Sequence, residues 1–127
     1  ALGVNVILMA LVTVFVGYGT FRLMLRVLPK TRAMVSGAAF AAALVSVPAS
    51  ALAFVVLYAL GGTADVSLGT VAAAMVGVHV LIGIGEALIT AVTVSSVLAV
   101  RPDLVYGARD LMKRPELRTA APSASQA

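Results

Sequence analysis

The sequence contains no cysteine, no tryptophan and only one histidine, His79. Without cysteine, the chain can form neither a disulfide nor a thiolate metal site. Charge is also scarce, because Asp, Glu, Lys and Arg make up only 11% of the 127 residues, whereas soluble domains contain about 25%. This composition argues against an ordinary soluble domain.

Apolar residues are correspondingly abundant. They make up 61% of the chain, and the mean hydropathy is +1.10. No segment of about ten residues alternates between polar and apolar positions, as the strands of a transmembrane barrel do. Since every backbone polar group in hydrocarbon must be satisfied internally, helices are the remaining structure. The sequence predicts an all-α integral membrane protein.

Three apolar runs are long enough to cross a bilayer, which takes about 20 residues. They cover about residues 2–21, 33–60 and 68–100, and we predict a transmembrane helix in each. Pro29 interrupts the chain after the first run, and Pro48 is expected to kink the second helix. The N-terminal half of the second run is rich in Ala, Ser and Gly, which favours close helix packing over a ligand groove.

The third run is longer than a bilayer requires. As one straight helix it would be about 50 Å long, against a hydrocarbon core of roughly 30 Å. The helix must tilt, project from the membrane or break, and Gly83-Ile84-Gly85 is the expected breaking point.

The domain boundary follows from composition. Residues 1–118 form the predicted transmembrane helical domain, and residues 119–127, rich in Ala, Ser and Pro, are expected to be a disordered cytoplasmic tail. The sequence begins at Ala1 directly in apolar residues, without an initiator methionine or the charged start of a signal peptide. We expect it to be the C-terminal part of a longer protein.

Basic residues are distributed unevenly between the links. The first link carries Arg22, Arg26, Lys30 and Arg32, and the second link carries none. The tail carries five: Arg101, Arg109, Lys113, Arg114 and Arg118. Because Lys and Arg favour the cytoplasmic side, we expect a multi-pass protein of the cell inner (plasma) membrane with its N-terminal end and Asp65 outside and its C-terminus cytoplasmic. This distribution explains the net charge of +4 without nucleic acid binding.

The third run holds two polar groups that are costly in hydrocarbon, His79 and Glu86. On one helix they lie on the same face, about 10 Å apart along the axis, and we expect both to point into the protein. We favour hydrogen bonding to neighbouring helices over a direct substrate role, because a transition-metal site needs more ligands than one histidine supplies. Asn5, near the outer end of the first run, is the other polar candidate.

No enzyme is predicted. The sequence has no HExxH or GxSxG motif, no Walker A loop and no paired carboxylates within an apolar run. The basic cluster Arg22, Arg26, Lys30 and Arg32 is explained first as a topology signal. The alternative is a docking site for a cytoplasmic or interfacial partner.

Three segments resemble one family of membrane proteins. They are Gly3-Val4-Asn5-Val6-Ile7-Leu8-Met9-Ala10, then His79-Val80-Leu81-Ile82-Gly83-Ile84-Gly85-Glu86-Ala87-Leu88-Ile89-Thr90, then Arg101-Pro102-Asp103-Leu104-Val105-Tyr106. In this order they resemble the CbiM/NikM family, the substrate-capture (S) membrane subunits of energy-coupling factor (ECF) transporters for cobalt and nickel. The resemblance covers nearly the whole chain up to the tail, and its middle segment is the most specific.

The resemblance implies ATP-driven uptake of Co²⁺ or Ni²⁺ as substrate, with no cofactor in this chain. The partners would be an ECF transmembrane coupling protein, cytoplasmic ATPase subunits and a small accessory membrane subunit. In the family, an N-terminal Met-His-Ile segment and a histidine in the N-terminal half hold the metal, and neither is present here. The three helices would then form the C-terminal half of a six- or seven-helix bundle, with Asn5, His79 and Glu86 supporting the pocket or pathway.

Two rival functions remain open. A non-transporting membrane anchor or assembly subunit would use the basic link to recruit partners. A proton-coupled exporter would be built around Glu86. Neighbouring genes for an ATPase and a coupling protein would favour the transporter subunit.

Overall fold

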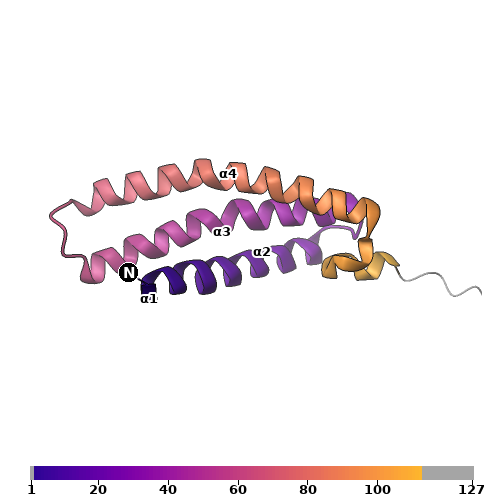
Figure 1. Ribbon diagram of the computed structural model, residues 1–127, viewed down its shortest axis with the longest axis horizontal. Coiled ribbons are helices and arrows are strands. Elements are labelled where there is room, and N and C mark those ends of the chain that lie inside the picture. Colours follow the sequence, from indigo (N-terminus) through magenta and orange to yellow (C-terminus); the bar gives the residue numbers. More distant parts are fainter. Residues whose placement is uncertain (1, 113–127) are drawn as a thin grey trace, which may run out of the picture.

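The computed structural model describes residues 2–112, and all regular structure in this part is helical (Figure 1). The elements are α1 (Leu2–Asn5), η1 (Val6–Val12), α2 (Thr13–Val27), α3 (Arg32–Gly61), α4 (Leu68–Val100), η2 (Pro102–Leu104) and η3 (Tyr106–Met112). The first three follow one another without a gap, so three long helices result, each long and apolar enough to cross a membrane. The prediction of an all-α protein with three transmembrane helices is confirmed.

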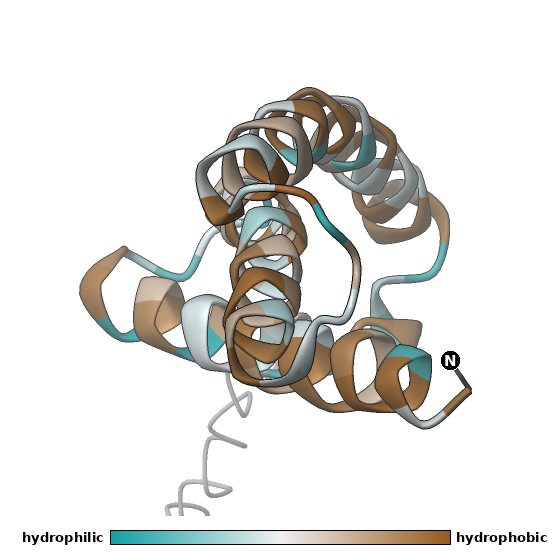
Figure 2. Cartoon of the chain, turned by 90° about the vertical axis from the view of Figure 1, so that its left-hand side faces the viewer, coloured by the Kyte–Doolittle hydropathy of each residue, from teal (hydrophilic) through white to brown (hydrophobic). Residues whose placement is uncertain are grey.

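The long helices lie side by side with α3 in the middle (Figures 1 and 2). α3 packs against α2 on one side and against α4 on the other. The link 62–67 lies at one end of the molecule, and η2 and η3 lie at the opposite end (Figure 1). Many large apolar side chains remain exposed on the outer faces of the helices, where Figure 2 shows hydrophobic colouring. Such a surface suits lipid, because apolar patches of this extent are rare on soluble monomers.

The first helix continues past the predicted span and ends at Val27. Leu28 takes an extended conformation, with φ −95° and ψ 148°, as residues that precede a proline prefer. The helix therefore stops directly before Pro29, and Arg22 and Arg26 extend from its last turns.

A π-helical segment, Val6–Val12, lies within the first helix. Here the carbonyl of Leu8 accepts hydrogen bonds from the backbone N–H of Thr13 and from its hydroxyl, the latter at 3.0 Å. The Ser50 hydroxyl of α3 donates to the same carbonyl at 3.2 Å. The wider π-helical turn thus lets the Leu8 carbonyl accept a hydrogen bond from α3. No pattern in the sequence indicates this π-helical segment.

α3 is rich in small residues on the faces that meet its neighbours. Thr31 caps its start, because the hydroxyl accepts the backbone N–H of Met34 at 3.2 Å. A Cβ placed on Gly17 of α2 would lie 3.5 Å from Cβ of Ser46, so the two helices approach as closely as small residues allow. The expectation of close packing is confirmed, and the helix continues through Pro48 without a break.

α4 is one continuous helix, so of the three alternatives the break at Gly83-Ile84-Gly85 does not occur. Glycine weakens a helix by only about 1 kcal/mol, and Gly83 is buried against α3. A Cβ there would lie 3.3 Å from the carbonyl oxygen of Leu44 and 3.4 Å from Cδ of Pro48. Since Pro48 has no N–H to donate to Leu44, the glycine covers a carbonyl that the proline leaves unpaired within its helix.

The link 62–67 is fastened to α3 by Tyr58. Its hydroxyl lies 2.8 Å from the carbonyl oxygen of Ala64 and 2.9 Å from that of Val66. The close approach requires a glycine at position 62, because a Cβ there would lie 2.6 Å from the carbonyl oxygen of Tyr58. Ser67 then caps α4 by accepting the N–H of Thr70 at 3.3 Å.

At the other end, the chain turns immediately after α4. The Arg101 guanidinium donates from Nε to Oδ1 of Asp103 at 2.9 Å and from Nη2 to Oδ2 at 2.8 Å. These hydrogen bonds hold the pKa of the Asp103 carboxyl below its ordinary value. η3 then packs back onto the helices through Ala108, which is buried with Val35 and Leu98.

Part of the predicted tail lies outside the described residues. This applies to the boundary at residue 118, to the tail 119–127, and to the three basic residues Lys113, Arg114 and Arg118. The other six Lys and Arg residues lie within the described part of the chain: Arg22, Arg26, Lys30, Arg32, Arg101 and Arg109.

Candidate functional site

His79 lies on α4, one turn before Gly83, and is half-buried. Its Nδ1 lies 2.6 Å from the carbonyl oxygen of Met75. Because a carbonyl can only accept, Nδ1 carries a proton, and in the neutral form of the ring the lone pair then lies on Nε2. Nε2 makes no hydrogen bond to any residue between 2 and 112. In its neutral form, His79 therefore has one nitrogen lone pair that can accept a hydrogen bond or bind a metal ion.

Glu86 lies on the same helix but is exposed. Within the described chain it has neither a hydrogen bond nor an ion pair. The buried face of α4 contains Gly83, Ala87 and Leu98, and Glu86 is one residue, or about 100° of rotation, away from Ala87. Glu86 therefore does not point into the part of the protein that residues 2–112 form, and its pointing into the whole protein stays a prediction.

Asn5 is also exposed, at the end of α1, and its side chain makes no capping hydrogen bond. α3 lies between its helix and α4 (Figure 1). The three predicted site residues therefore do not form one cluster. His79 and Glu86 share a helix, about 10 Å apart along its axis, and Asn5 lies on another. Among residues 2–112, no three side chains of His, Asp or Glu lie close enough together to hold a metal ion.

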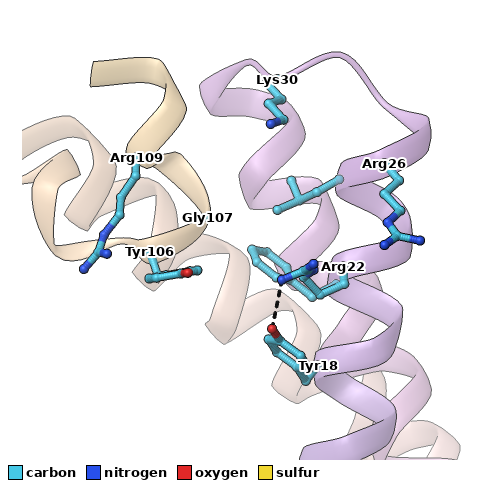
Figure 3. Close-up of a pocket in the computed structure, with 9 residues that line it drawn as sticks. Tyr18, Arg22, Arg26, Lys30, Tyr106, Gly107 and Arg109 are labelled. Carbon is cyan, nitrogen blue, oxygen red and sulfur yellow. Dashed lines mark hydrogen bonds between the residues drawn. The ribbon is translucent and has the colours of Figure 1, made fainter. Parts of the chain in front are cut away.

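A basic cleft lies where the end of α2 faces η3 (Figure 3). Its volume is about 530 Å³, and its lining residues are Tyr18, Phe21, Arg22, Leu25, Arg26, Lys30, Tyr106, Gly107 and Arg109. Arg22 donates from Nη1 to the hydroxyl of Tyr18 at 3.0 Å. The guanidinium of Arg109 lies 4.5 Å from the ring centre of Tyr106. The cleft thus unites three of the four predicted docking residues with a fourth cation from η3.

Arg32, the remaining predicted docking residue, lies apart from this cleft. It stands at the start of α3 and lines a smaller depression with Ser36 and Ser95. The hydroxyl oxygens of these two serines lie 2.8 Å apart and join α3 to α4. The basic end therefore offers two separate surfaces rather than one.

Tyr18, Tyr106 and Arg109 are absent from the predicted site. For Tyr18 a signal existed, because it precedes Arg22 by four residues and so shares its helix face. For Tyr106 and Arg109 no local signal existed, since their place in the cleft depends on η3 folding back onto α2.

Comparison with known proteins identifies the family. The chain matches the family described as "Cobalt uptake substrate-specific transmembrane region" (CbiM) over residues 1–104. A protein of Haloquadratum walsbyi named "Putative metal transport protein" is 39% identical over 106 residues, which are 84% of this chain and 46% of that protein. The chain thus spans about half the length of this curated relative. No solved structure gives a significant match.

The matched residues include all three transmembrane helices and the turn that follows α4. They also include the positions of Asn5, His79 and Glu86. A match over this much of the chain goes beyond shared hydropathy. The chain belongs to the CbiM family, the substrate-specific transmembrane region of cobalt uptake proteins.

Proposed function

We propose that the chain is part of the substrate-capture membrane subunit of an ATP-driven, ECF-type transporter that takes up Co²⁺ or Ni²⁺. The observation that carries the proposal is family membership over residues 1–104. The similar protein of Haloquadratum walsbyi, named for metal transport, supports the same class of function. The metal ion is the substrate of this protein, and no resident cofactor is needed.

His79 and Glu86 are the residues that we assign to the pocket or pathway of the ion, with Asn5 in support. His79 keeps a lone pair on Nε2, and imidazole nitrogen suits Co²⁺ and Ni²⁺. The exposed carboxylate of Glu86 would attract a divalent cation strongly in a low-dielectric environment. Because the two lie about 10 Å apart along α4, they would act at different depths of a path rather than in one coordination sphere.

The partners would be a transmembrane coupling protein, cytoplasmic ATPase subunits and a small accessory membrane subunit. We assign their contact to the basic end of the molecule, which the positive-inside rule puts in the cytoplasm, where ATP is available. Arg32 is the candidate contact residue outside the cleft, since it lies exposed at the start of α3.

Uptake of radiolabelled cobalt by cells with the complete transporter tests the proposal. Deleting this chain should reduce uptake to the background of cells that lack the transporter. Arg32→Gln should lower the recovery of the coupling protein with the chain, whereas Asp65→Asn, which removes a charge from the link 62–67 at the opposite end, serves as the control.

Two results would contradict the proposal. Unchanged uptake without the chain would exclude a role in transport. Unchanged uptake together with lost recruitment of the partners to the membrane would instead favour a non-transporting anchor or assembly subunit.

A further inference from the structure

The polar side chains of α4 differ in whether the described chain satisfies them. Those near the two ends of the helix are hydrogen-bonded: Thr70, Ser95 and Ser96. Four groups between positions 79 and 93 have no hydrogen bond or ion pair with residues 2–112: Nε2 of His79, the carboxylate of Glu86 and the hydroxyls of Thr90 and Thr93. Neither threonine bonds to a carbonyl of its own helix, as threonines in transmembrane helices often do.

These four residues lie on one side of α4, and we call them the polar stripe. At about 100° per residue, His79, Thr90 and Thr93 all lie within about 40° of Glu86 around the helix axis, so the stripe is about 60° wide. No apolar residue between positions 79 and 93 falls inside this arc. From His79 to Thr93 the stripe runs about 21 Å along the helix.

The polar stripe lies between two other faces of α4. On one side is the face that packs against α3, with the buried residues Gly83 and Ala87 about 60° and 100° from Glu86. On the other side, the exposed residues are large and apolar: Leu81, Ile82, Leu88, Ile89 and Val92. The second of these faces suits lipid, whereas the stripe between them does not.

Polar groups of this kind are costly against hydrocarbon. Ionisable residues within transmembrane segments almost always face the interior of a helix bundle or a water-filled cavity. No cation of the described chain pairs with Glu86. The carboxylate and hydroxyl oxygens, and Nε2 of neutral His79, can all accept hydrogen bonds. A surface that covers the stripe must therefore supply hydrogen-bond donors.

Three coverings can be compared on these grounds. Lipid tails supply no donors. The stripe of a second copy would bring a second Glu86 carboxylate toward the first, and like charges repel. A helix of a separate partner protein would leave Glu86 in lipid whenever the subunit is free. A further helix of the same subunit has none of these disadvantages, and the similar protein of Haloquadratum walsbyi matches this chain over only 46% of its own length.

We propose that the polar stripe is the surface on which another transmembrane helix of the same subunit packs, and that this helix presents hydrogen-bond donors to Glu86 and to the threonine hydroxyls. Polar side chains join transmembrane helices in this way. The ion path that we assign to His79 and Glu86 then runs between α4 and this helix. The inference takes from the proposed function only that the chain is part of a larger subunit, and it does not depend on metal transport.

Spin labels on single cysteines test the inference in the full-length subunit, purified without its partner proteins and placed in lipid nanodiscs. Residues 1–127 contain no cysteine, and any cysteine elsewhere is replaced by serine. Thr90→Cys and Thr93→Cys place a label on the polar stripe. Leu88→Cys and Val92→Cys, at side chains that are 57% and 66% exposed, are the matched controls on the lipid side. Oxygen dissolves in hydrocarbon, so we expect its access to be several-fold lower at the stripe than at the controls.

Every other labelling result overturns the inference and identifies a different covering. Equal access of oxygen to the stripe and the controls would identify lipid. Access of a water-soluble chromium complex to the stripe would identify an open aqueous path. Broadening of the spectrum by a second label would identify a second copy. Protection that arises only when the coupling protein is added would identify a helix of another subunit.

Thermal unfolding provides a second measurement that needs no label. In the full-length subunit, Glu86→Leu should lower the unfolding midpoint, because donors on the covering helix lose their acceptor. Glu86→Gln keeps an acceptor oxygen and should retain the midpoint, and Leu88→Ala on the lipid side is the control. An unchanged midpoint in Glu86→Leu would overturn the inference. Neither measurement involves a metal ion, so a failure of the proposed transport is detected separately, by the uptake assay.

Discussion

At the scale of single residues, Glu86 combines two features that do not fit a purely structural role. It lies within a long apolar helix, and the described chain gives it no partner. The sequence predicts a carboxylate within hydrocarbon, because the run around Glu86 is apolar. The sequence does not show that this carboxylate is exposed, because exposure depends on which face of α4 packs against α3. That face contains the buried residues Gly83 and Ala87.

We expect Glu86→Leu to leave the free energy of unfolding of the purified chain unchanged or higher. No hydrogen bond within residues 2–112 is lost, and a charge at the centre of a transmembrane helix costs about 3 kcal/mol on insertion scales. Thermal unfolding in detergent micelles measures this, with wild type in parallel. A clearly less stable variant would show that the carboxylate is satisfied within the chain.

Substitution of Glu86 should lower cobalt uptake even though it does not lower the free energy of unfolding of the purified chain. Glu86→Gln keeps the shape of the side chain but removes the charge that attracts a divalent cation, so we expect radiolabelled cobalt uptake to fall about tenfold or more. Membrane levels of the complete transporter are measured as the control. Near-normal uptake with Gln but not with Leu would instead identify Glu86 as a hydrogen-bonding residue toward another part of the protein.

The ion pair between Arg101 and Asp103, which follows the transmembrane helix α4, makes the free energy of unfolding depend on pH. Hydrogen bonds from Arg101 hold the folded pKa of Asp103 below its ordinary value of 3.8. The pair therefore adds stability above that value, and the contribution is lost as the pH falls through the folded pKa. Both side chains are largely exposed, so the effect on stability is small at neutral pH.

Carboxyl NMR of isotopically labelled aspartate can check this expectation. In wild type, the Asp103 signal should titrate with a midpoint below 3.8. In the Arg101→Gln variant the midpoint should rise toward the ordinary value, because the donor of the two hydrogen bonds is gone. Identical midpoints in the two proteins would contradict the pairing.

At the scale of helices, long apolar runs were sufficient to predict three transmembrane helices, and Pro29 was sufficient to predict the interruption after the first. The π-helical segment Val6–Val12 and the unbroken α4 could not be predicted, because both depend on contacts with α3. The Ser50 hydroxyl reaches the Leu8 carbonyl, and Gly83 fits against Leu44 and Pro48. A glycine in a sequence indicates a break or a close approach equally well, and only the neighbouring helix decides between them.

Gly83 and Gly85 form a matched pair that tests the packing of α4. A Cβ on Gly83 would lie 3.3 Å from the Leu44 carbonyl oxygen, whereas a Cβ on Gly85 would have nothing within 4 Å. We expect Gly83→Leu to destabilise the chain by about 1–3 kcal/mol through overpacking. Gly85→Leu should be neutral or slightly stabilising, because leucine is the better helix former.

Unfolding of the purified chain by dodecyl sulfate, followed by circular dichroism, measures both variants. If glycine served flexibility at this point, as the expected break implied, the two substitutions would have similar effects. A difference confined to Gly83 would confirm that the segment is a contact surface.

At the scale of the whole molecule, the chain is a three-helix layer whose two ends differ in charge. One end holds the link 62–67 with Asp65 and no cation, and the other holds six cations of the described chain: Arg22, Arg26, Lys30, Arg32, Arg101 and Arg109. Because the helices run antiparallel to their neighbours (Figure 1), charges that are separate in the sequence collect at one end. The basic cleft and the proposed docking surface both lie there.

Orientation in the membrane follows from this asymmetry. The positive-inside rule predicts that the basic end is cytoplasmic and the link 62–67 is outside. The chain has no cysteine of its own, so Thr63→Cys and Leu104→Cys each provide a single reporter at opposite ends of α4, about 50 Å apart. An impermeant thiol reagent should label only Thr63→Cys in intact cells and both variants after permeabilisation.

The opposite labelling pattern would have a specific consequence. If Leu104→Cys reacted in intact cells and Thr63→Cys did not, the basic end would face away from the ATPase subunits, and the assignment of Arg32 to partner docking would fail. Equal labelling of both positions in intact cells would instead contradict the three-crossing topology itself, since one crossing, α4, must separate Thr63 from Leu104.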